Sequence, residues 1–227
     1  MKSVVPLHVY MTWKHKQLPP LMRQSLITLQ QQNPEFQFHL YSDEDCLDFI
    51  RKHFSPMVVS AFNALLPGAY KADLWRLCIL YVNGGYYMDI KLSSINGFRL
   101  IELSDGEHFA LDRPQHSLHI YNAIMVCKAK NPFLLKCIRQ IVYHVSIQYY
   151  GESYLSPTGP EMMGRVAKSF RLPIDMNYPL NYPEHIMYKG RLVLRNYPGY
   201  REEQTQLTKT QPYYANAWRV RDIYKKK

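Results

Sequence analysis

The chain has few cysteines and no long apolar run, and these absences exclude several classes of protein. Its 227 residues include 4 cysteines, Cys46, Cys78, Cys127 and Cys137, with no C-x-x-C pair among them. Each cysteine lies among apolar neighbours, which predicts buried free thiols in a reducing compartment rather than zinc ligands or disulfides. No stretch reaches the roughly 18 consecutive apolar residues of a transmembrane helix. We therefore expect no integral membrane segment.

The sequence also lacks the short motifs of several common enzyme classes. It contains no G-x-S-x-G, no G-x-x-x-x-G-K-[ST] and no G-x-G-x-x-G. Its 9 histidines do not cluster with carboxylates at the spacing of metal ligands. The apolar N-terminal run contains Pro6 and no small-residue cleavage site, so it predicts a strand rather than a signal peptide. Hydrolase and P-loop interpretations have no support.

Positive charge is in excess but is not concentrated in one segment. Lys and Arg number 28 against 18 Asp and Glu, which gives a formal net charge of +10. This charge favours an anionic partner. Charge alone does not distinguish a phosphate-bearing small molecule, a nucleic acid and an anionic membrane surface. Nucleic-acid binding would show a steep dependence on salt. The scattered basic residues argue against it, and we expect no nucleic-acid partner.

Alternating strand and helix patterns predict an α/β fold. Residues 5–13 and 35–41 have strand patterns, and residues 21–32 and 42–54 have helical ones. Ser42 and Asp45 have the spacing of a capping box, which places a helix start there. This rhythm predicts one domain with a mostly parallel central sheet flanked by helices. The later predicted elements are helix 69–82, strand 86–90, strand 121–128, helix 132–150, a helix starting at Pro160 and strand 191–197.

Residues 68–92, GAYKADLWRLCILYVNGGYYMDIKL, place a few charges inside apolar runs. Asp73 and Arg76 are one turn apart on the predicted helix, which fits either a local ion pair on an exposed face or a pair of ligand-binding groups. Asp89 follows three large apolar residues at the end of a predicted strand. A carboxylate there either caps a neighbouring loop or faces a ligand, because ligands bind beyond the carboxyl ends of strands in open α/β sheets.

The segment from residue 68 to residue 90 resembles the core signature of glycosyltransferase family 32, the DXD sugar transferases. Its pattern D-x-x-R…GG-x-Y-x-D is also similar to that of the glucosyltransferase domains of large clostridial toxins. The resemblance extends to VYMTWKHKQLPP and NPEFQFHLYSDED, with weaker similarity in YNAIMVCKAKNPFL and SPTGPEMM. Together these pieces span about residues 5 to 165.

This resemblance implies a GT-A fold that forms a single domain over residues 1–227. Residues 1–165 would form the nucleotide-sugar-binding core, and residues 166–227 would close the site. The implied reaction is transfer of a hexosyl or N-acetylhexosaminyl group from a nucleotide-sugar, with a UDP-sugar as the first candidate. The acceptor is a hydroxyl of a glycan, a glycoprotein or a small molecule, and the resemblance implies retention of anomeric configuration.

The resemblance also assigns roles to particular residues. Asp89, Asp73 and Arg76 are the implied catalytic set, in which Asp73 and Arg76 bind donor-sugar hydroxyls. Trp13 is expected to stack on the donor base, with a core aromatic as the alternative. Donor-binding positions are Thr12, Trp13, Tyr70, Asp73, Arg76, Asp89, Lys91, Asn122 and Trp218. Thr158 and Gly159, before Pro160, are placed on the acceptor side.

The metal-binding part of the family motif departs from the usual pattern. The family carries D-x-D, whose second aspartate binds a divalent metal, whereas this chain has D-I-K with Lys91 in that place. Mn²⁺ or Mg²⁺ is the implied cofactor, with Asp89 and Asn216 as its ligands. Three alternatives stay open for Lys91. It turns away and leaves Asp89 to hold a metal, it contacts the diphosphate itself, or the site retains binding without catalysis.

Two expectations concern the whole protein. The substitution by Lys91 motivates a second hypothesis, a nucleotide-sugar-binding module descended from an enzyme. Because the chain shows neither a signal nor a membrane anchor, we expect a cytoplasmic enzyme of bacterial or viral type, not a secreted one.

Overall fold

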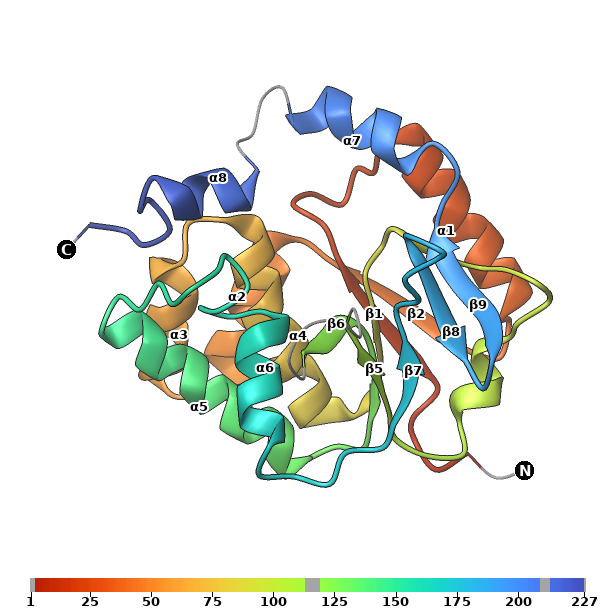
Figure 1. Ribbon diagram of the computed structural model, residues 1–227, viewed down its shortest axis with the longest axis horizontal. Coiled ribbons are helices and arrows are strands. Elements are labelled where there is room, and N and C mark those ends of the chain that lie inside the picture. The colour runs from red at the N-terminus through yellow and green to blue at the C-terminus, as the bar shows by residue number, and fades with distance from the viewer. Residues whose placement is uncertain (1–2, 113–118, 209–212, 227) are drawn as a thin grey trace.

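One mixed sheet of nine strands runs through the protein (Figure 1). The computed structural model describes residues 3–112, 119–208 and 213–226. Within these residues the strand order is β2-β1-β3-β6-β5-β7-β8-β9-β4. The strands are β1 (His8–Thr12), β2 (Gln37–Tyr41), β3 (Gly85–Met88), β4 (Leu92–Ser94), β5 (His108–Leu111), β6 (Ile120–Cys127), β7 (Ile174–Asn177), β8 (His185–Tyr188) and β9 (Arg191–Asn196).

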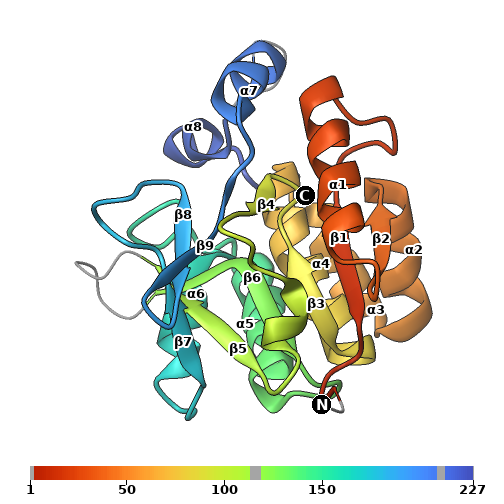
Figure 2. The ribbon, with the colours of Figure 1, turned by 90° about the vertical axis from the view of Figure 1, so that its right-hand side faces the viewer.

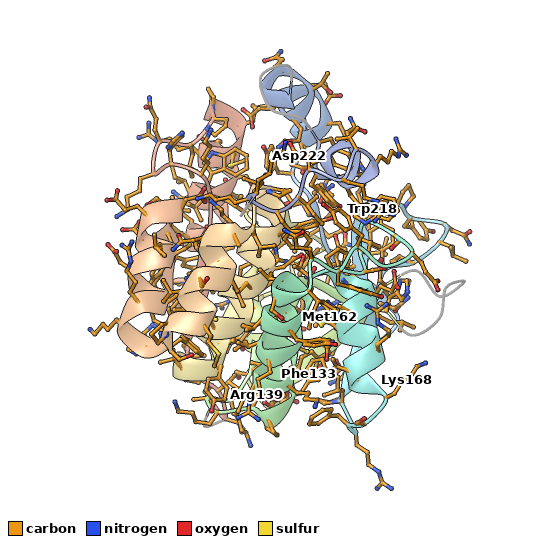
Figure 3. All side chains as sticks on the ribbon, turned by 90° about the vertical axis from the view of Figure 1, so that its left-hand side faces the viewer. Phe133, Arg139, Met162, Lys168, Trp218 and Asp222 are labelled. Carbon is orange, nitrogen blue, oxygen red and sulfur yellow. The ribbon has the colours of Figure 1, made fainter. Side chains whose placement is uncertain are left out.

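Helices cover both faces of this sheet. They are α1 (Pro20–Gln32), α2 (Asp43–His53), α3 (Pro56–Ala64), α4 (Gly68–Asn83), the 3₁₀ helix η1 (Leu100–Leu103), α5 (Pro132–Ser146), α6 (Pro160–Ala167), α7 (Tyr200–Thr208) and α8 (Tyr214–Arg219). Figure 3 looks onto α5 and α6, which lie side by side, with Trp218 of α8 above them. None of the helices in the described ranges is long and apolar enough to cross a membrane.

The α/β class is confirmed, but the sheet is mixed rather than mostly parallel. β1 pairs in parallel with β2 and β3, and β5 pairs in parallel with β7. The remaining pairings are antiparallel, beginning with β3 and β6. The strand–helix rhythm of residues 5–90 correctly predicts the parallel part. Beyond residue 90, short connections join β7 to β8 and β8 to β9, and strands joined in this way pair antiparallel.

Two apolar clusters pack on the two faces of the sheet. One contains Tyr10 and Tyr87 from the strands and side chains of α2 to α6. The other contains Val9 and Tyr86, with side chains of α1, η1, β8 and β9. Because successive residues of a strand point to opposite faces, Tyr86 and Tyr87 enter different clusters. The same alternation turns the next residue on Tyr87's side, Asp89, toward α4.

Several local predictions are confirmed. Ser42 and Asp45 form the capping box at the start of α2. Gly84 ends α4 with φ 66°, and a Cβ there would lie 2.7 Å from the backbone nitrogen of Ala129. The four cysteines are buried free thiols. The sequence patterns did not predict α3, β4, η1, β5, β7, β8, α7 or α8, and α5 ends at Ser146 rather than near residue 150.

The C-terminal helix α7 supplies the cap that α1 does not provide for itself. Pro19 precedes α1 and has no side-chain hydrogen bond to the helix. The buried carboxylate of Glu203 accepts hydrogen bonds from the backbone N–H groups of Leu21, at 3.0 Å, and Met22, at 3.2 Å. It also accepts one from the hydroxyl of Tyr197. A negative charge at a helix N-terminus is favourable, so Glu203 fixes α7 beside α1 (Figure 1).

Replacing Glu203 with glutamine is expected to lower the free energy of unfolding by about 1–3 kcal/mol, because one of the acceptor oxygens becomes a donor that faces buried N–H groups. Chemical denaturation measures this loss. Glu202→Gln, an exposed neighbour in the same turn, is the matched control and should leave stability nearly unchanged. Equal stability of the two variants would contradict the role given to Glu203.

Candidate functional site

The carboxyl end of β3 places Asp89 beside the central helix α4. The Asp89 backbone N–H donates to the carbonyl of Ala123 on β6 at 2.8 Å, and the Leu92 N–H donates to the Asp89 carbonyl at 2.9 Å. Asp89 and Lys91 therefore lie in a tight turn between β3 and β4, although the sequence predicted that the strand continues to residue 90. The Tyr87 hydroxyl donates to Asp89 Oδ1 at 2.8 Å.

Asp73 and Arg76 lie on the buried side of α4. Their residue exposures are 8% and 5%, so the interpretation as an ion pair on an exposed face is wrong. Arg76 Nη2 lies 3.4 Å from Asp73 Oδ1, and Arg76 Nη1 lies 3.3 Å from Asp89 Oδ1. The guanidinium also stacks over the Tyr87 ring, 4.4 Å from its centroid. One arginine thus joins a carboxylate of the helix to a carboxylate of the strand end.

Two residues from other elements complete the hydrogen bonds of Asp73. The Asn122 side-chain amide of β6 donates to Asp73 Oδ1 at 2.9 Å, and its backbone carbonyl accepts from Arg76 Nη1 at 2.7 Å. The Thr158 hydroxyl, just before α6, donates to Asp73 Oδ2 at 2.7 Å. A Cβ on Gly159 would lie 3.5 Å from the same oxygen. The positions expected on the donor and acceptor sides therefore meet at one carboxylate.

Lys91 forms the outer part of this cluster. Its Nζ lies 3.0 Å from Asp89 Oδ2, and the two side chains are 23% and 21% exposed, against 6% for Arg76. The ammonium also lies 5.8 Å from the centroid of the Tyr121 ring. We call Asp73, Arg76, Asp89, Lys91, Asn122 and Thr158 the central polar cluster. It has a buried inner part around Asp73 and an outer part that reaches solvent at Asp89 and Lys91.

The two carboxyl groups have opposite electrostatic environments. Burial raises the pKa of the Asp73 carboxyl, and the favourable contacts with Arg76, Thr158 and Asn122 offset only part of that effect. Burial also acts to raise the pKa of Asp89, but the charges of Lys91 and Arg76 outweigh it and hold that pKa below its usual range. Asp89 is therefore the carboxylate that stays ionised at the open side of the cluster.

Other residues predicted for the site have protein partners of their own. The Thr12 hydroxyl donates to the Tyr41 carbonyl at 3.0 Å, and the Tyr70 hydroxyl donates to the Tyr154 carbonyl at 2.8 Å. The indole N–H of Trp218 donates to the Tyr150 carbonyl at 2.8 Å. The expected contacts of these three residues with a donor stay predictions.

Two further predictions concern Asn216 and Trp13. Asn216 is exposed on α8, and Arg219 Nη1 lies 3.5 Å from its side-chain oxygen. Its pairing with Asp89 at a metal stays a prediction. Trp13 is half-buried against the cluster of Val9 and Tyr86. Its stacking on a donor base stays a prediction.

Three tyrosines around the cluster were missed by sequence reasoning. Tyr87 donates to Asp89 and carries the Arg76 guanidinium on its ring. Tyr121 lies beside Lys91. Tyr200, at the start of α7, lies near enough for burial, Lys91 and Asp89 to shift its pKa, with a net rise. Strand alternation identifies Tyr87, since it precedes Asp89 by two residues. Tyr121 and Tyr200 have no such signal because tertiary structure alone brings them here.

Comparison with known proteins agrees with this arrangement. Residues 19–112, which contain α4 and the Asp89 turn, match the family model described as "Glycosyltransferase sugar-binding region containing DXD motif". The match to this DXD glycosyltransferase family covers less than half of the chain. A solved structure, the PaToxG glycosyltransferase, superposes with a TM-score of 0.58 over 74% of this chain and 70% of that one, at 14% sequence identity. The GT-A-like fold of this glycosyltransferase region is thereby confirmed.

The curated relatives are mannosyltransferases of yeasts. Inositol phosphoceramide mannosyltransferase 3 of Schizosaccharomyces pombe is 24% identical over 176 residues, which cover 74% of this chain and 46% of that protein. The initiation-specific alpha-1,6-mannosyltransferase of Saccharomyces cerevisiae is 30% identical over 96 residues, covering 39% of this chain and 20% of that protein. The chain thus spans less than half the length of these relatives. The expectation of a cytoplasmic enzyme of bacterial or viral type is wrong, because these relatives are mannosyltransferases of yeasts.

Proposed function

We propose that the protein is a glycosyltransferase that moves a hexosyl group from a nucleoside-diphosphate sugar to a hydroxyl acceptor. The observation that carries the proposal is the meeting of Asp73, Arg76 and Asp89 at the carboxyl end of β3, within the matched family region. A mannosyl group is the first candidate, since the curated relatives are named mannosyltransferases. UDP and GDP are the candidates for the nucleoside diphosphate of the donor.

The chemistry of such a transfer explains why the cluster has two parts. When the bond between the anomeric carbon and the diphosphate oxygen breaks, its electron pair goes to the diphosphate and the sugar gains positive charge. An acceptor hydroxyl forms the new bond to the anomeric carbon, and its proton passes to an oxygen of the departing diphosphate. Fixed charges stabilise this redistribution without having to reorganise. Asp89 and Lys91 lie at the open side, where they meet the donor.

In this proposal the inner residues position the outer ones. Arg76 is only 6% exposed at its side chain and contacts both carboxylates. Arg76 holds Asp89 in place from the buried side of the cluster, while Asn122 and Thr158 orient Asp73. Asp73 is the inner carboxylate available to a sugar hydroxyl that enters the cluster. Such a set of convergent polar groups fixes the orientation of a hydrated ring. Retention of anomeric configuration stays a prediction from the family.

We also propose that residues 166–227 close the site. Figure 2 shows α7 and α8 at one end of the molecule and the N-terminus at the other. Tyr200 of α7 approaches Lys91 and Asp89, and Tyr214 of α8 contacts the Tyr70 ring edge-on, with centroids 5.8 Å apart. Both helices thus reach the end of the sheet at which β1 and β3 finish.

The test is release of UDP or GDP from a panel of UDP- and GDP-sugars, including mannose, glucose and N-acetylglucosamine donors, with simple sugars as acceptors. Release from one donor, increased by one acceptor, is the expected result. A binding module is the second candidate, favoured by the lysine in the family's second acidic position. It predicts donor binding by calorimetry with no release from any donor. Absence of both binding and release would contradict the two proposals together.

A further inference from the structure

We propose that Lys91 supplies the positive charge at the donor diphosphate and that the site binds the diphosphate without a divalent metal ion. The inference rests on the proposed function and specifies how the same site recognises its substrate. The first observation behind it is that the residues present do not fit the metal that the family implies. Among the residues that the structure describes, no three His, Cys, Asp or Glu side chains come together as a metal site requires.

The carboxylate that would bind the metal is already occupied by donors. Asp89 Oδ1 accepts from the Tyr87 hydroxyl and faces Arg76 Nη1 at 3.3 Å, and Oδ2 faces Lys91 Nζ at 3.0 Å. Hard divalent cations select sets of oxygen ligands without a competing cation beside them. Two fixed cations at Asp89 repel a third. The residues present therefore do not fit Mn²⁺ or Mg²⁺, and we derive no step through a metal.

Lys91 has the position and the free donors that diphosphate binding needs. An ammonium group carries three N–H donors. Asp89 is its hydrogen-bonding partner among the described side chains, which leaves donors for phosphate oxygens. The 3.0 Å contact with Asp89 and the 23% exposure of the Lys91 side chain place the ammonium at the open side of the cluster.

The backbone fixes this charge in place. The Leu92 N–H closes the turn onto Asp89, and the Tyr197 N–H donates to the Lys91 carbonyl at 2.8 Å. β4 then pairs with β9 from Leu92 onward. Arg76 holds Asp89, Asp89 holds the ammonium end of Lys91, and β9 and Tyr197 hold the main chain, so the ammonium is preorganised. A preorganised point charge can neutralise a departing diphosphate in place of a metal.

The experiment measures binding of UDP and GDP by isothermal titration calorimetry, once with EDTA and once with Mn²⁺. We expect the nucleoside diphosphate that binds to do so with equal affinity in both buffers. Lys91→Gln should weaken this affinity on the order of 10- to 100-fold, as loss of a charged hydrogen bond does. It should leave the affinity for the corresponding nucleoside unchanged. Lys189→Gln, at an exposed lysine, is the control and should bind like the wild type.

A second variant tests whether an acidic residue at position 91 makes nucleotide binding depend on a metal ion. Lys91→Asp replaces the cation with the acidic residue of the family motif, so its UDP or GDP affinity should become dependent on Mn²⁺. Circular dichroism checks that both variants fold. Binding by the wild type only when Mn²⁺ is present would overturn the inference and leave the proposed function standing. Failure of the wild type to bind any nucleoside diphosphate in either buffer would instead overturn the proposed function, and this inference with it.

Discussion

Replacing Arg76 with methionine is expected to lower the free energy of unfolding by about 3–5 kcal/mol, the range found when one partner of a buried ion pair is removed. Methionine has a similar length and fills much of the space. It leaves Asp73 and Asp89 without the shared guanidinium, and the Asn122 carbonyl loses the donor 2.7 Å away. Urea unfolding followed by circular dichroism measures the difference.

The control for this variant is an arginine with the same local spacing and a different environment. Arg51 Nη1 lies 3.0 Å from Asp48 Oδ1 three residues earlier on α2, with side chains 56% and 65% exposed. Arg51→Met should change stability by less than about 1 kcal/mol, because exposed ion pairs contribute little. A similarly small effect of Arg76→Met would contradict the assignment of Arg76 as the group that joins the two carboxylates.

The comparison of these two arginines shows what sequence spacing can predict. Asp48–Arg51 and Asp73–Arg76 have the same i,i+3 spacing, yet one pair is exposed and the other is buried. The difference comes from α4, which packs against α2, α3 and α5 as well as the sheet. Spacing within one helix contains no information about these neighbours. The assignment of the buried pair to a binding site comes from the resemblance to the family, not from the spacing, and stays a prediction.

The fold was predictable where structure is local. The capping box of Ser42 and Asp45 depends on a few adjacent residues, and this prediction is confirmed. The antiparallel pairing of β3 with β6 and of β4 with β9 joins segments far apart in the chain, and the prediction of a mostly parallel sheet is wrong. The turn at Asp89 also escaped the sequence pattern, since an apolar run does not show where a strand ends.

The site was predictable for residues that share a motif and unpredictable for those that tertiary structure brings in. Asp73, Arg76 and Asp89 lie together as the motif implied. Asn122 and Thr158 also join them, although weaker resemblance had placed them on different sides of the pocket. Tyr200 comes from a segment without resemblance to the family. The Glu203 cap that holds α7 on α1 explains how that segment reaches the cluster.

Asp89→Asn is expected to lower kcat/KM for sugar transfer by about 10²- to 10³-fold, the effect of removing one preorganised charge-stabilising group. Asparagine has the same shape and keeps an oxygen that can accept from Tyr87. It removes the negative charge that holds Lys91 at 3.0 Å and faces Arg76 at 3.3 Å. The measurement is nucleotide release from the donor found in the panel, alongside a thermal melt. Asp48→Asn on α2, 65% exposed, is the control.

The double variant Asp89→Asn with Lys91→Gln separates two roles for the carboxylate. If Asp89 acts only by holding the ammonium in place, removal of Lys91 already removes the contribution of Asp89 to kcat/KM. The double variant should then be no slower than the slower single variant, since contacting residues that act as a unit are not additive. If the fold-losses in kcat/KM of the two single variants multiply in the double variant, Asp89 contacts the sugar directly and independently of Lys91. Near-normal transfer by a folded Asp89→Asn protein would contradict both roles and would place the reaction outside the central polar cluster.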